Sequence, residues 1–333
     1  MKHLQFNSFG EASEVVELAD AELAPPPGRG EVRVLMLASP INPSDLLKTQ
    51  GRYGASRPHL PMGCGVEGVG KVIEVGAGVD HLHDGDLVLL RFGGKPVWAE
   101  QLTLDATRLF ALPQADPAQL SMLAANPGTA WRMLHSAVDL EPGDWIIQNA
   151  ANSGVGQCVI QLARNLGFRT INLVRSKQAA ALVRDLGGDI VLLEDEDLPE
   201  HCAERPRLAL DAIGGEATAR LGGHLAEGGR VLTYGLLSGR NAELAPSDLI
   251  FRRVTLEGFW LAPWADTAPR KELESVYGPL AGLVADGKLH MKVEQVYGLA
   301  DHRTALSHAA RSGRGGKILF RGNDPVTAAE NAN

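Results

Sequence analysis

The feature that most constrains this chain is a strand, turn and helix pattern near its middle. Residues 144–150 have the composition of a buried strand, and apolar residues recur at helical spacing from Gly154 onward. The turn between them, 150–153, contains only small residues. The first N–H groups of a helix have no partner within the helix, so such a turn forms an anion-binding site. A dinucleotide pyrophosphate fits there.

The turn departs from the usual G-x-G-x-x-G pattern of dinucleotide-binding turns. The three glycine positions fall on Ala151, Ser153 and Gly156. As a pattern match the turn is therefore weak, and an ordinary strand-to-helix turn in another α/β protein remains an alternative. The segments that follow the turn favour the dinucleotide interpretation.

Composition narrows the class of protein. With 333 residues the chain is longer than one core usually holds, so two domains are expected. The net charge of −8 argues against binding of nucleic acid or of an anionic membrane. No apolar run is long enough to span a membrane, and the N-terminal residues lack the apolar core of a signal peptide. Three cysteines at unrelated spacings indicate a reducing compartment, so we expect a cytoplasmic protein.

The pattern of elements changes along the chain. Up to about residue 120, short strand patterns such as Glu31–Ala38, Lys71–Val75 and Asp86–Leu90 are separated by Gly and Pro. From 121 to 264, strands alternate with helices, which predicts a parallel doubly wound sheet with its ligand at the carboxyl ends of the strands. The six predicted strands are Trp145–Asn149, Thr170–Val174, Ile190–Leu193, Leu208–Ala212, Arg230–Tyr234 and Thr255–Phe259.

The remainder of the chain, 265–333, contains a predicted helix (Arg270–Gly287) and a strand near Lys317–Phe320. We expect it to return to the first domain. The predicted organisation is therefore a β-rich domain made of 1–120 and 265–333, with an α/β domain of 121–264 inserted in it.

The end of the second predicted strand indicates which cofactor is bound. A site selective for NAD usually carries Asp or Glu there, whereas this chain has Arg175, Ser176 and Lys177. Two cations and a hydroxyl suit a 2′-phosphate, which predicts NADPH. The alternative is that Arg175 and Lys177 belong to a solvated loop.

Several segments resemble one enzyme family. They are INPSDLLKTQGRYG at 41–54, GVEGVGKV at 65–72, NPGTAWRML at 126–134, IQNAANSGVGQ at 147–157 and GFWLAPW at 258–264. The chain resembles the medium-chain dehydrogenase/reductase superfamily, and within it the 2-enoyl thioester reductases of the mitochondrial type. This resemblance implies a GroES-like catalytic domain and a Rossmann domain that binds NADPH. It also implies no metal, because the zinc-ligand positions of the superfamily's alcohol dehydrogenases fall on Asn42 and Val66.

An NADPH enzyme without zinc can reduce a carbon–carbon double bond conjugated to a carbonyl, if a donor protonates the α carbon. Tyr53 is the expected donor, because a phenol is protonated at neutral pH and the residue lies in a Gly-flanked loop. It also matches the donor tyrosine of the family. Two alternatives are that Tyr53 only lines the pocket, and that Tyr234 is the donor, although Tyr234 is expected to touch the cofactor.

The resemblance implies further contacts, each with a simpler alternative such as a helix cap or a core aromatic. For the substrate pocket they are Asn42 and Trp264. For NADPH they are Asn126, Asn152, Ser153, Gly154, Val155, Gly156, Arg175, Lys177, Tyr234, Gly235, Leu236, Leu237, Phe259, Trp260, Leu261 and Lys317.

Three functions remain open from the sequence. The first is NADPH-dependent reduction of 2-enoyl thioesters of CoA or of acyl-carrier protein, the carrier protein then being a partner. The second is a quinone or small-enone reductase, and the third is a cofactor-binding protein without turnover. Tyr53 and the GFWLAPW segment favour the first. A homodimer is expected through Thr255–Phe259, because an uncovered edge strand favours pairing with a second copy.

Overall fold

The computed structural model describes residues 1–22, 25–54, 59–197 and 204–322, and the chain divides into two compact units. The first unit takes Met1–Ala125 and Trp264–Asn333, and the second takes Asn126–Pro263. The chain thus leaves the first unit once and returns to it after completing the second.

The second unit is built on a parallel sheet of six strands in the order β10-β9-β8-β11-β12-β13. By position along the chain this order is 3-2-1-4-5-6, that of a doubly wound dinucleotide-binding fold. The predicted parallel sheet is confirmed, and the predicted strand ends agree within one residue. The strands are β8 (Trp145–Gln148), β9 (Arg169–Val174), β10 (Ile190–Leu193), β11 (Leu208–Asp211), β12 (Arg230–Thr233) and β13 (Thr255–Gly258).

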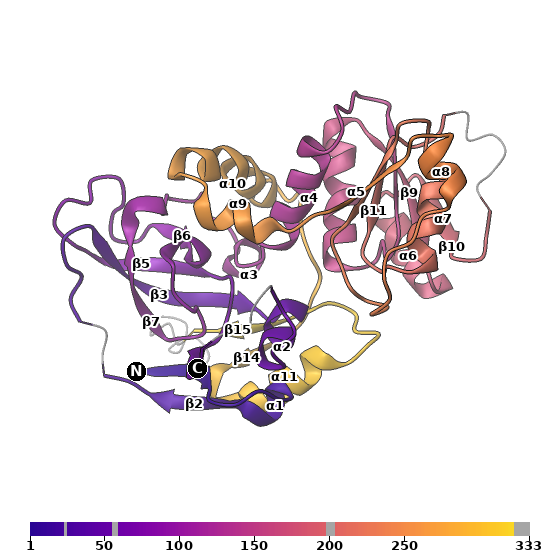
Figure 1. The fold of residues 1–333 in the computed structure, drawn as a ribbon. Helices are drawn as coiled ribbons and strands as arrows, with labels where there is room; N and C mark the ends of the chain where they lie inside the picture. Colours follow the sequence, from indigo (N-terminus) through magenta and orange to yellow (C-terminus); the bar gives the residue numbers. More distant parts are fainter. Residues whose placement is uncertain (23–24, 55–58, 198–203, 323–333) are drawn as a thin grey trace. The chain divides into compact units, whose positions relative to one another are not determined.

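Helices connect these strands and pack against them (Figure 1). The helix after the small-residue turn, α5 (Gly154–Leu166), starts at the cap residue Ser153 and ends at Gly167, whose φ of 79° is in the left-handed region. Fully buried apolar side chains of the strands, such as Ile147 and Val231, form the core on the sheet. The other helices are α4 (Asn126–Ser136), α6 (Lys177–Asp185), α7 (Glu216–His224) and α8 (Pro246–Ile250). The boundary between the two units falls inside α9 (Leu261–Thr267).

The first unit is largely antiparallel. One sheet has the order β2-β1-β4, and a larger one has the order β14-β15-β3-β5-β6 with β7 also paired to β3. The strands are β1 (Lys2–Phe6), β2 (Val16–Asp20), β3 (Glu31–Pro40), β4 (Met62–Gly63), β5 (Val69–Val75), β6 (Leu87–Leu89), β7 (Gln101–Asp105), β14 (Val293–Gly298) and β15 (Lys317–Arg321). The last strand, β15, pairs with the end of β3.

Helices α1 (Ala12–Val15), α2 (Pro43–Thr49), α3 (Pro117–Leu120), α10 (Arg270–Ala285) and α11 (His302–Ala310) complete this unit. The long helix α10 forms close to its predicted bounds. Strand β14 and helix α11 were not predicted. Strand β14 has no buried residue and lacks a clear alternation of apolar residues. Within the described ranges, no helix has both the length and the apolar character that crossing a bilayer requires.

Candidate functional site

The turn between β8 and α5 has the form that the sequence predicts. The Ser153 side chain caps the helix by accepting from the Gly156 N–H at 3.2 Å. Gly156 is required for close packing, because a Cβ atom there would lie 2.6 Å from the Ala151 carbonyl oxygen. The first N–H groups of α5 therefore face the carboxyl edge of the sheet, where an anion can accept from them.

Two buried polar groups beside this turn lack hydrogen-bond partners in the described part of the chain. They are the Asn126 Nδ2 and the Tyr234 hydroxyl. Asn126 lies against the turn, since a Cβ on Gly154 would be 3.0 Å from its Oδ1. Burial raises the pKa of Tyr234 well above its usual range, and the neighbouring Ser153 offsets only part of this. Unsatisfied buried donors are costly, so their presence at a helix N-terminus fits a site for an acceptor-rich ligand such as a dinucleotide.

The other second-unit candidates follow the carboxyl ends of neighbouring parallel strands. Tyr234–Leu237 comes directly after β12, and Phe259–Leu261 comes after β13. Leu236 and Trp260 are exposed at 71% and 49%. The backbone comes close to β11 at Gly235, where a Cβ would meet the Ala212 carbonyl oxygen at 2.4 Å. The fold thus brings these residues to one edge of the sheet, the edge where doubly wound folds bind ligands.

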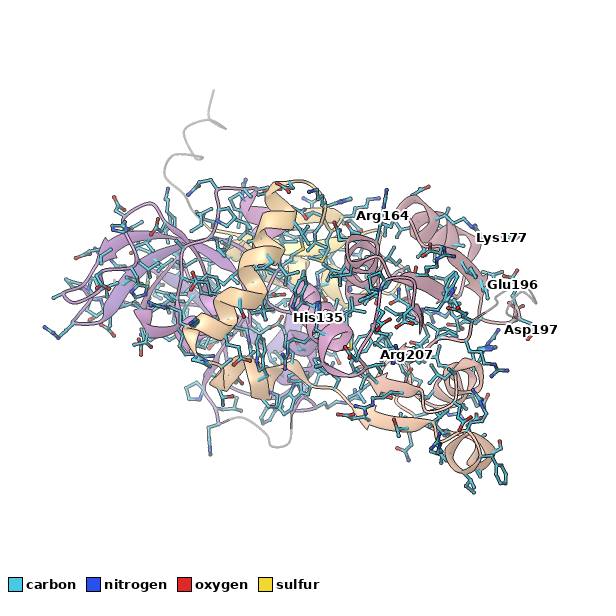
Figure 2. The ribbon with its side chains drawn as sticks, turned by 90° about the horizontal axis from the view of Figure 1, so that it is seen from above. His135, Arg164, Lys177, Glu196, Asp197 and Arg207 are labelled. Atoms are coloured by element: carbon cyan, nitrogen blue, oxygen red, sulfur yellow. The ribbon has the colours of Figure 1, made fainter. Side chains whose placement is uncertain are left out.

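Arg175 and Lys177 lie where the sequence places them, directly after β9, and both are exposed. Ser176 between them caps α6 by accepting from the Ala179 N–H at 3.2 Å. A cavity of about 240 Å³ lies beside the start of α6, and two of its lining residues, Lys177 and Glu196, are labelled in Figure 2. It is lined by Lys177, Ala180, Arg184, Leu193 and Glu196.

Sequence reasoning missed a buried carboxylate at the same edge. Asp211 ends β11 and accepts from Asn149 Nδ2 at 2.7 Å and from the hydroxyls of Thr218 and Thr233. Backbone N–H groups of the following turn also donate to it. Burial raises the pKa of Asp211, but the hydrogen bonds outweigh it and leave the pKa below its usual value. An Asp that ends an otherwise apolar strand was the available signal.

In the first unit, Tyr53 lies in the loop after α2 and is half-buried. The Lys48 ammonium is 5.8 Å from the centre of its ring. Burial lowers the pKa of Lys48, and the nearby Asp45 carboxylate opposes this shift. Loop and helix thus hold the phenol beside a cation.

Asn42 and Lys317, which come from opposite ends of the chain, are in direct contact. Lys317 Nζ donates to Asn42 Oδ1 at 2.6 Å, and Asn42 Nδ2 donates to Glu67 Oε1 at 2.7 Å. Asn42 is also the residue at the N-cap position of α2. Its amide, however, is engaged by Lys317 and Glu67, a cluster that the sequence did not predict.

Trp264, the second pocket candidate, lies in α9 and is half-buried. Its indole nitrogen donates to Glu272 Oε1 at 2.5 Å, and its ring is 6.1 Å from that of Tyr277. This residue therefore has structural contacts that do not require a ligand. In the described ranges, no group of three or more His, Cys, Asp or Glu side chains is arranged to hold a metal ion.

Comparison with known proteins places the chain in a family. Residues 28–114 match the family described as alcohol dehydrogenase GroES-like domain, and residues 154–274 match the family described as zinc-binding dehydrogenase. The mitochondrial enoyl-[acyl-carrier-protein] reductase of Rattus norvegicus is 38% identical over 322 residues, which cover 92% of this chain and 84% of that protein.

Two solved structures extend this similarity to the fold. The complex of Etr1p with NADP and crotonyl-CoA has a TM-score of 0.85 at 25% identity, covering 96% of this chain and 99% of that one. The Escherichia coli quinone oxidoreductase complexed with NADPH has a TM-score of 0.83 at 25% identity, covering 96% and 100%. With these matches over nearly its whole length, the chain belongs to the medium-chain dehydrogenase/reductase family, and enoyl-[acyl-carrier-protein] reductases are among its relatives.

Proposed function

We propose that this protein is an NADPH-dependent 2-enoyl thioester reductase. One observation carries the proposal: a helix start lined with unpartnered donors stands at the carboxyl edge of a doubly wound sheet. The chain that carries this helix start is 38% identical to a protein named enoyl-[acyl-carrier-protein] reductase, and the match covers 92% of the chain. The substrate class is an enoyl thioester of CoA or of acyl-carrier protein.

In this proposal the donors beside the small-residue turn bind the pyrophosphate of NADPH. The α5 N–H groups, the Asn126 amide and the Tyr234 hydroxyl supply hydrogen bonds, and Gly154 and Gly156 let the backbone approach closely. Arg175 and Lys177 pair with the 2′-phosphate. The remaining contacts are assigned to Asn152, Ser153, Val155, Gly235, Leu236, Leu237, Phe259, Trp260, Leu261 and Lys317.

When bound, NADPH supplies the hydride that is added to the β carbon of the enoyl group. Tyr53 then donates its hydroxyl proton to the α carbon and regains a proton from solvent. Lys48, 5.8 Å from the ring centre, favours the negative charge that the phenol carries between these two events. Asn42 and Trp264 are assigned to the walls of the substrate pocket.

The second candidate is an NADPH-dependent quinone or small-enone reductase. The similarity in fold to a quinone oxidoreductase complexed with NADPH, with a TM-score of 0.83, favours it. The two functions share the cofactor edge and differ in the acceptor, so turnover of the two kinds of acceptor separates them.

The assembly and location belong to the proposal as well. We assign a homodimer that forms through β13, whose four residues are all exposed at the edge of the sheet. A cytoplasmic location and acyl-carrier protein as a partner stay predictions. The curated relatives are named as mitochondrial proteins.

The test is the steady-state reduction of crotonyl-CoA and of a longer trans-2-enoyl-CoA, with NADPH and NADH compared and a quinone as competing acceptor. We expect turnover of the enoyl-CoAs with preference for NADPH. Tyr53→Phe should lower kcat by about a hundredfold or more, because a positioned general acid contributes that much. The KM for NADPH should not change.

The matched control is Tyr297→Phe, which removes a first-unit hydroxyl bonded to His308 Nδ1 and should leave kcat unchanged. If only the quinone is reduced, the second candidate replaces the first. If Tyr53→Phe retains full turnover, the proton donor is another residue.

A further inference from the structure

A fully buried carboxylate of the first unit has no part in the chemistry proposed above. Glu67 precedes β5 and has no exposed surface. Burial raises the pKa of its carboxyl group, and Lys317 and the hydrogen bonds from Asn42 and Ala125 oppose this shift. Burying a carboxyl group is costly unless its oxygens are satisfied, so the bonds that it makes deserve a functional explanation.

Both oxygens of Glu67 accept hydrogen bonds from fixed donors. Oε1 accepts from Asn42 Nδ2 at 2.7 Å, and Oε2 accepts from the Ala125 backbone N–H at 2.6 Å. The Asn42 Oδ1, at the far end of the same amide, accepts from Lys317 Nζ at 2.6 Å. A continuous chain of hydrogen bonds thus runs from the Ala125 backbone through Glu67 and Asn42 to the Lys317 ammonium.

The groups at the two ends of this series of hydrogen bonds, the Ala125 N–H and the Lys317 ammonium, determine the direction of every hydrogen bond in it. A backbone N–H and an ammonium group can only donate, so each must face an acceptor. A side-chain amide has one donor end and one acceptor end, so Asn42 presents its oxygen to Lys317 only if it faces an acceptor on the other side. A carboxylate, which accepts at both oxygens, meets both demands at position 67.

We propose that Glu67 is a positioning residue for Lys317, acting through the orientation of the Asn42 amide. The inference rests on the proposed function, which assigns Lys317 to NADPH. With Asn42 held in this orientation, its oxygen anchors the ammonium in one place. Lys317 therefore meets the cofactor with its position already set, and less conformational entropy is lost on binding.

The variant Glu67→Gln tests the directional argument because it keeps the shape and replaces one acceptor by a donor. The glutamine oxygen can face either the Ala125 N–H or Asn42, and the backbone cannot turn away. Asn42 must then reverse its amide and present its NH₂ group to the Lys317 ammonium. Two donors repel, and the half-buried lysine, which is the flexible end of the chain, moves away.

The experiment is a double-mutant cycle of Glu67→Gln with Lys317→Met, measured as the Kd for NADPH by fluorescence and as KM and kcat with crotonyl-CoA. Each single variant should raise the Kd about tenfold, the loss expected for a hydrogen bond to a charged group. The double variant should bind no more weakly than Lys317→Met alone. If Glu67 had a purely structural role, the increases in Kd caused by Glu67→Gln and by Lys317→Met would instead multiply in the double variant.

The matched control is Asp45→Asn. Asp45 is also buried and accepts from the Asn42 backbone N–H at 2.8 Å, but it is outside the chain of bonds to Lys317. This variant should leave the Kd for NADPH within twofold of the wild-type value. If Glu67→Gln does not fold, Asn42→Leu takes its place in the cycle, because it removes the link and leaves the bond from Ala125 to Glu67 intact.

The outcomes separate the inference from the function on which it rests. If the wild-type protein does not bind NADPH, the proposed function fails, and the inference fails with it. If the wild-type protein binds and turns over, but Glu67→Gln leaves the Kd unchanged or adds its full loss to that of Lys317→Met, the inference alone is wrong.

Discussion

Asp45 is a buried carboxyl group whose pKa is raised, whereas the pKa values of Asp105 and Asp211 are lowered. Burial raises its pKa from 3.8 to about 7, although the Asn42 backbone N–H and Lys48 act in the opposite direction. One of its oxygens, Oδ1, has no hydrogen-bond partner in the described ranges. The folded state therefore binds a proton at Asp45 more tightly than the unfolded chain does.

The sign of the resulting pH dependence follows by linkage. Because the pKa is raised in the folded state, the contribution of Asp45 to stability is complete below about pH 4 and is lost as the pH rises through about 7. At 1.36 kcal/mol per pKa unit, the upper limit of this loss is about 4 kcal/mol. When the pH is raised from 5.5 to 8, the free energy of unfolding, measured with urea, should therefore fall less for Asp45→Asn than for the wild type.

Asp105→Asn is the control for this experiment. Asp105 is a mostly exposed cap whose pKa is lowered by the hydrogen bond from the Thr107 N–H, so it stays ionised throughout this pH range. Its variant should follow the wild-type slope. A wild-type stability that is the same at both pH values, with Asp45→Asn unchanged, would contradict the raised pKa.

At the scale of single residues, the sequence predicted positions better than partners. It placed Arg175 and Lys177 after the second strand, and its simpler alternative for Asn42, a helix cap, agrees with the N-cap position of Asn42 before α2. It did not show that Lys317 binds Asn42, because these residues are 275 positions apart and meet only through the pairing of β15 with β3. It considered Glu67 only as a residue that holds its loop, and it did not predict the hydrogen bonds of Glu67 to Asn42 or of Asp211 to Asn149, whose partners also lie on other elements.

At the scale of elements, the turn between β8 and α5 is the most constrained segment. Gly156→Ala would place a Cβ 2.6 Å from the Ala151 carbonyl oxygen, which is backbone and cannot rotate away. We expect a loss of about 1–3 kcal/mol in unfolding free energy. The Kd for NADPH should rise, because the turn must shift where the pyrophosphate binds.

Gly223→Ala is the matched control for this substitution. Gly223 lies in α7 with no atom within 4 Å of an added Cβ, and alanine favours helices by up to about 1 kcal/mol over glycine. This variant should be as stable as the wild type or more so, with unchanged NADPH binding. Equal losses of unfolding free energy from Gly156→Ala and Gly223→Ala would contradict a steric constraint at Gly156.

In the second unit, the bounds of the parallel strands were predicted within one residue, because each strand is a short apolar run between helices. Ile190–Leu193, for example, has its predicted bounds. The first unit was harder. Strand β14 has no buried residue, and β4 contains two residues, so neither carries an alternating pattern. Such strands form because a neighbouring strand offers unpaired backbone groups: β14 pairs with β15, and β4 pairs with β1.

At the scale of the whole molecule, the exposed edge strand β13 of the parallel sheet predicts a homodimer. All four residues of β13 are exposed, and Ile250 and Phe251 before it are exposed at 66% and 78%. Uncovered edges and apolar patches favour pairing with a second copy. We expect a dimer in solution, and Leu256→Lys should shift it toward the monomer in sedimentation equilibrium.

The chain offers a close control for this test in Val296→Lys. Leu256 and Val296 are each 38% exposed, and each lies on the outermost strand of its sheet. Only the Leu256 variant should weaken the dimer. A wild-type monomer at micromolar concentration would contradict the assignment of β13 as the interface.

The pairing of β15 with β3 also sets an order of events during synthesis. The ribosome produces β3 first, then the whole second unit, and the strand that carries Lys317 only after that unit. The second unit is continuous in the chain, so it can fold while the first unit still lacks its last strand. The Lys317–Asn42–Glu67 contact can therefore form only after the second unit has been synthesised, and a chain released before β15 would carry a finished Rossmann fold but no lysine at this position.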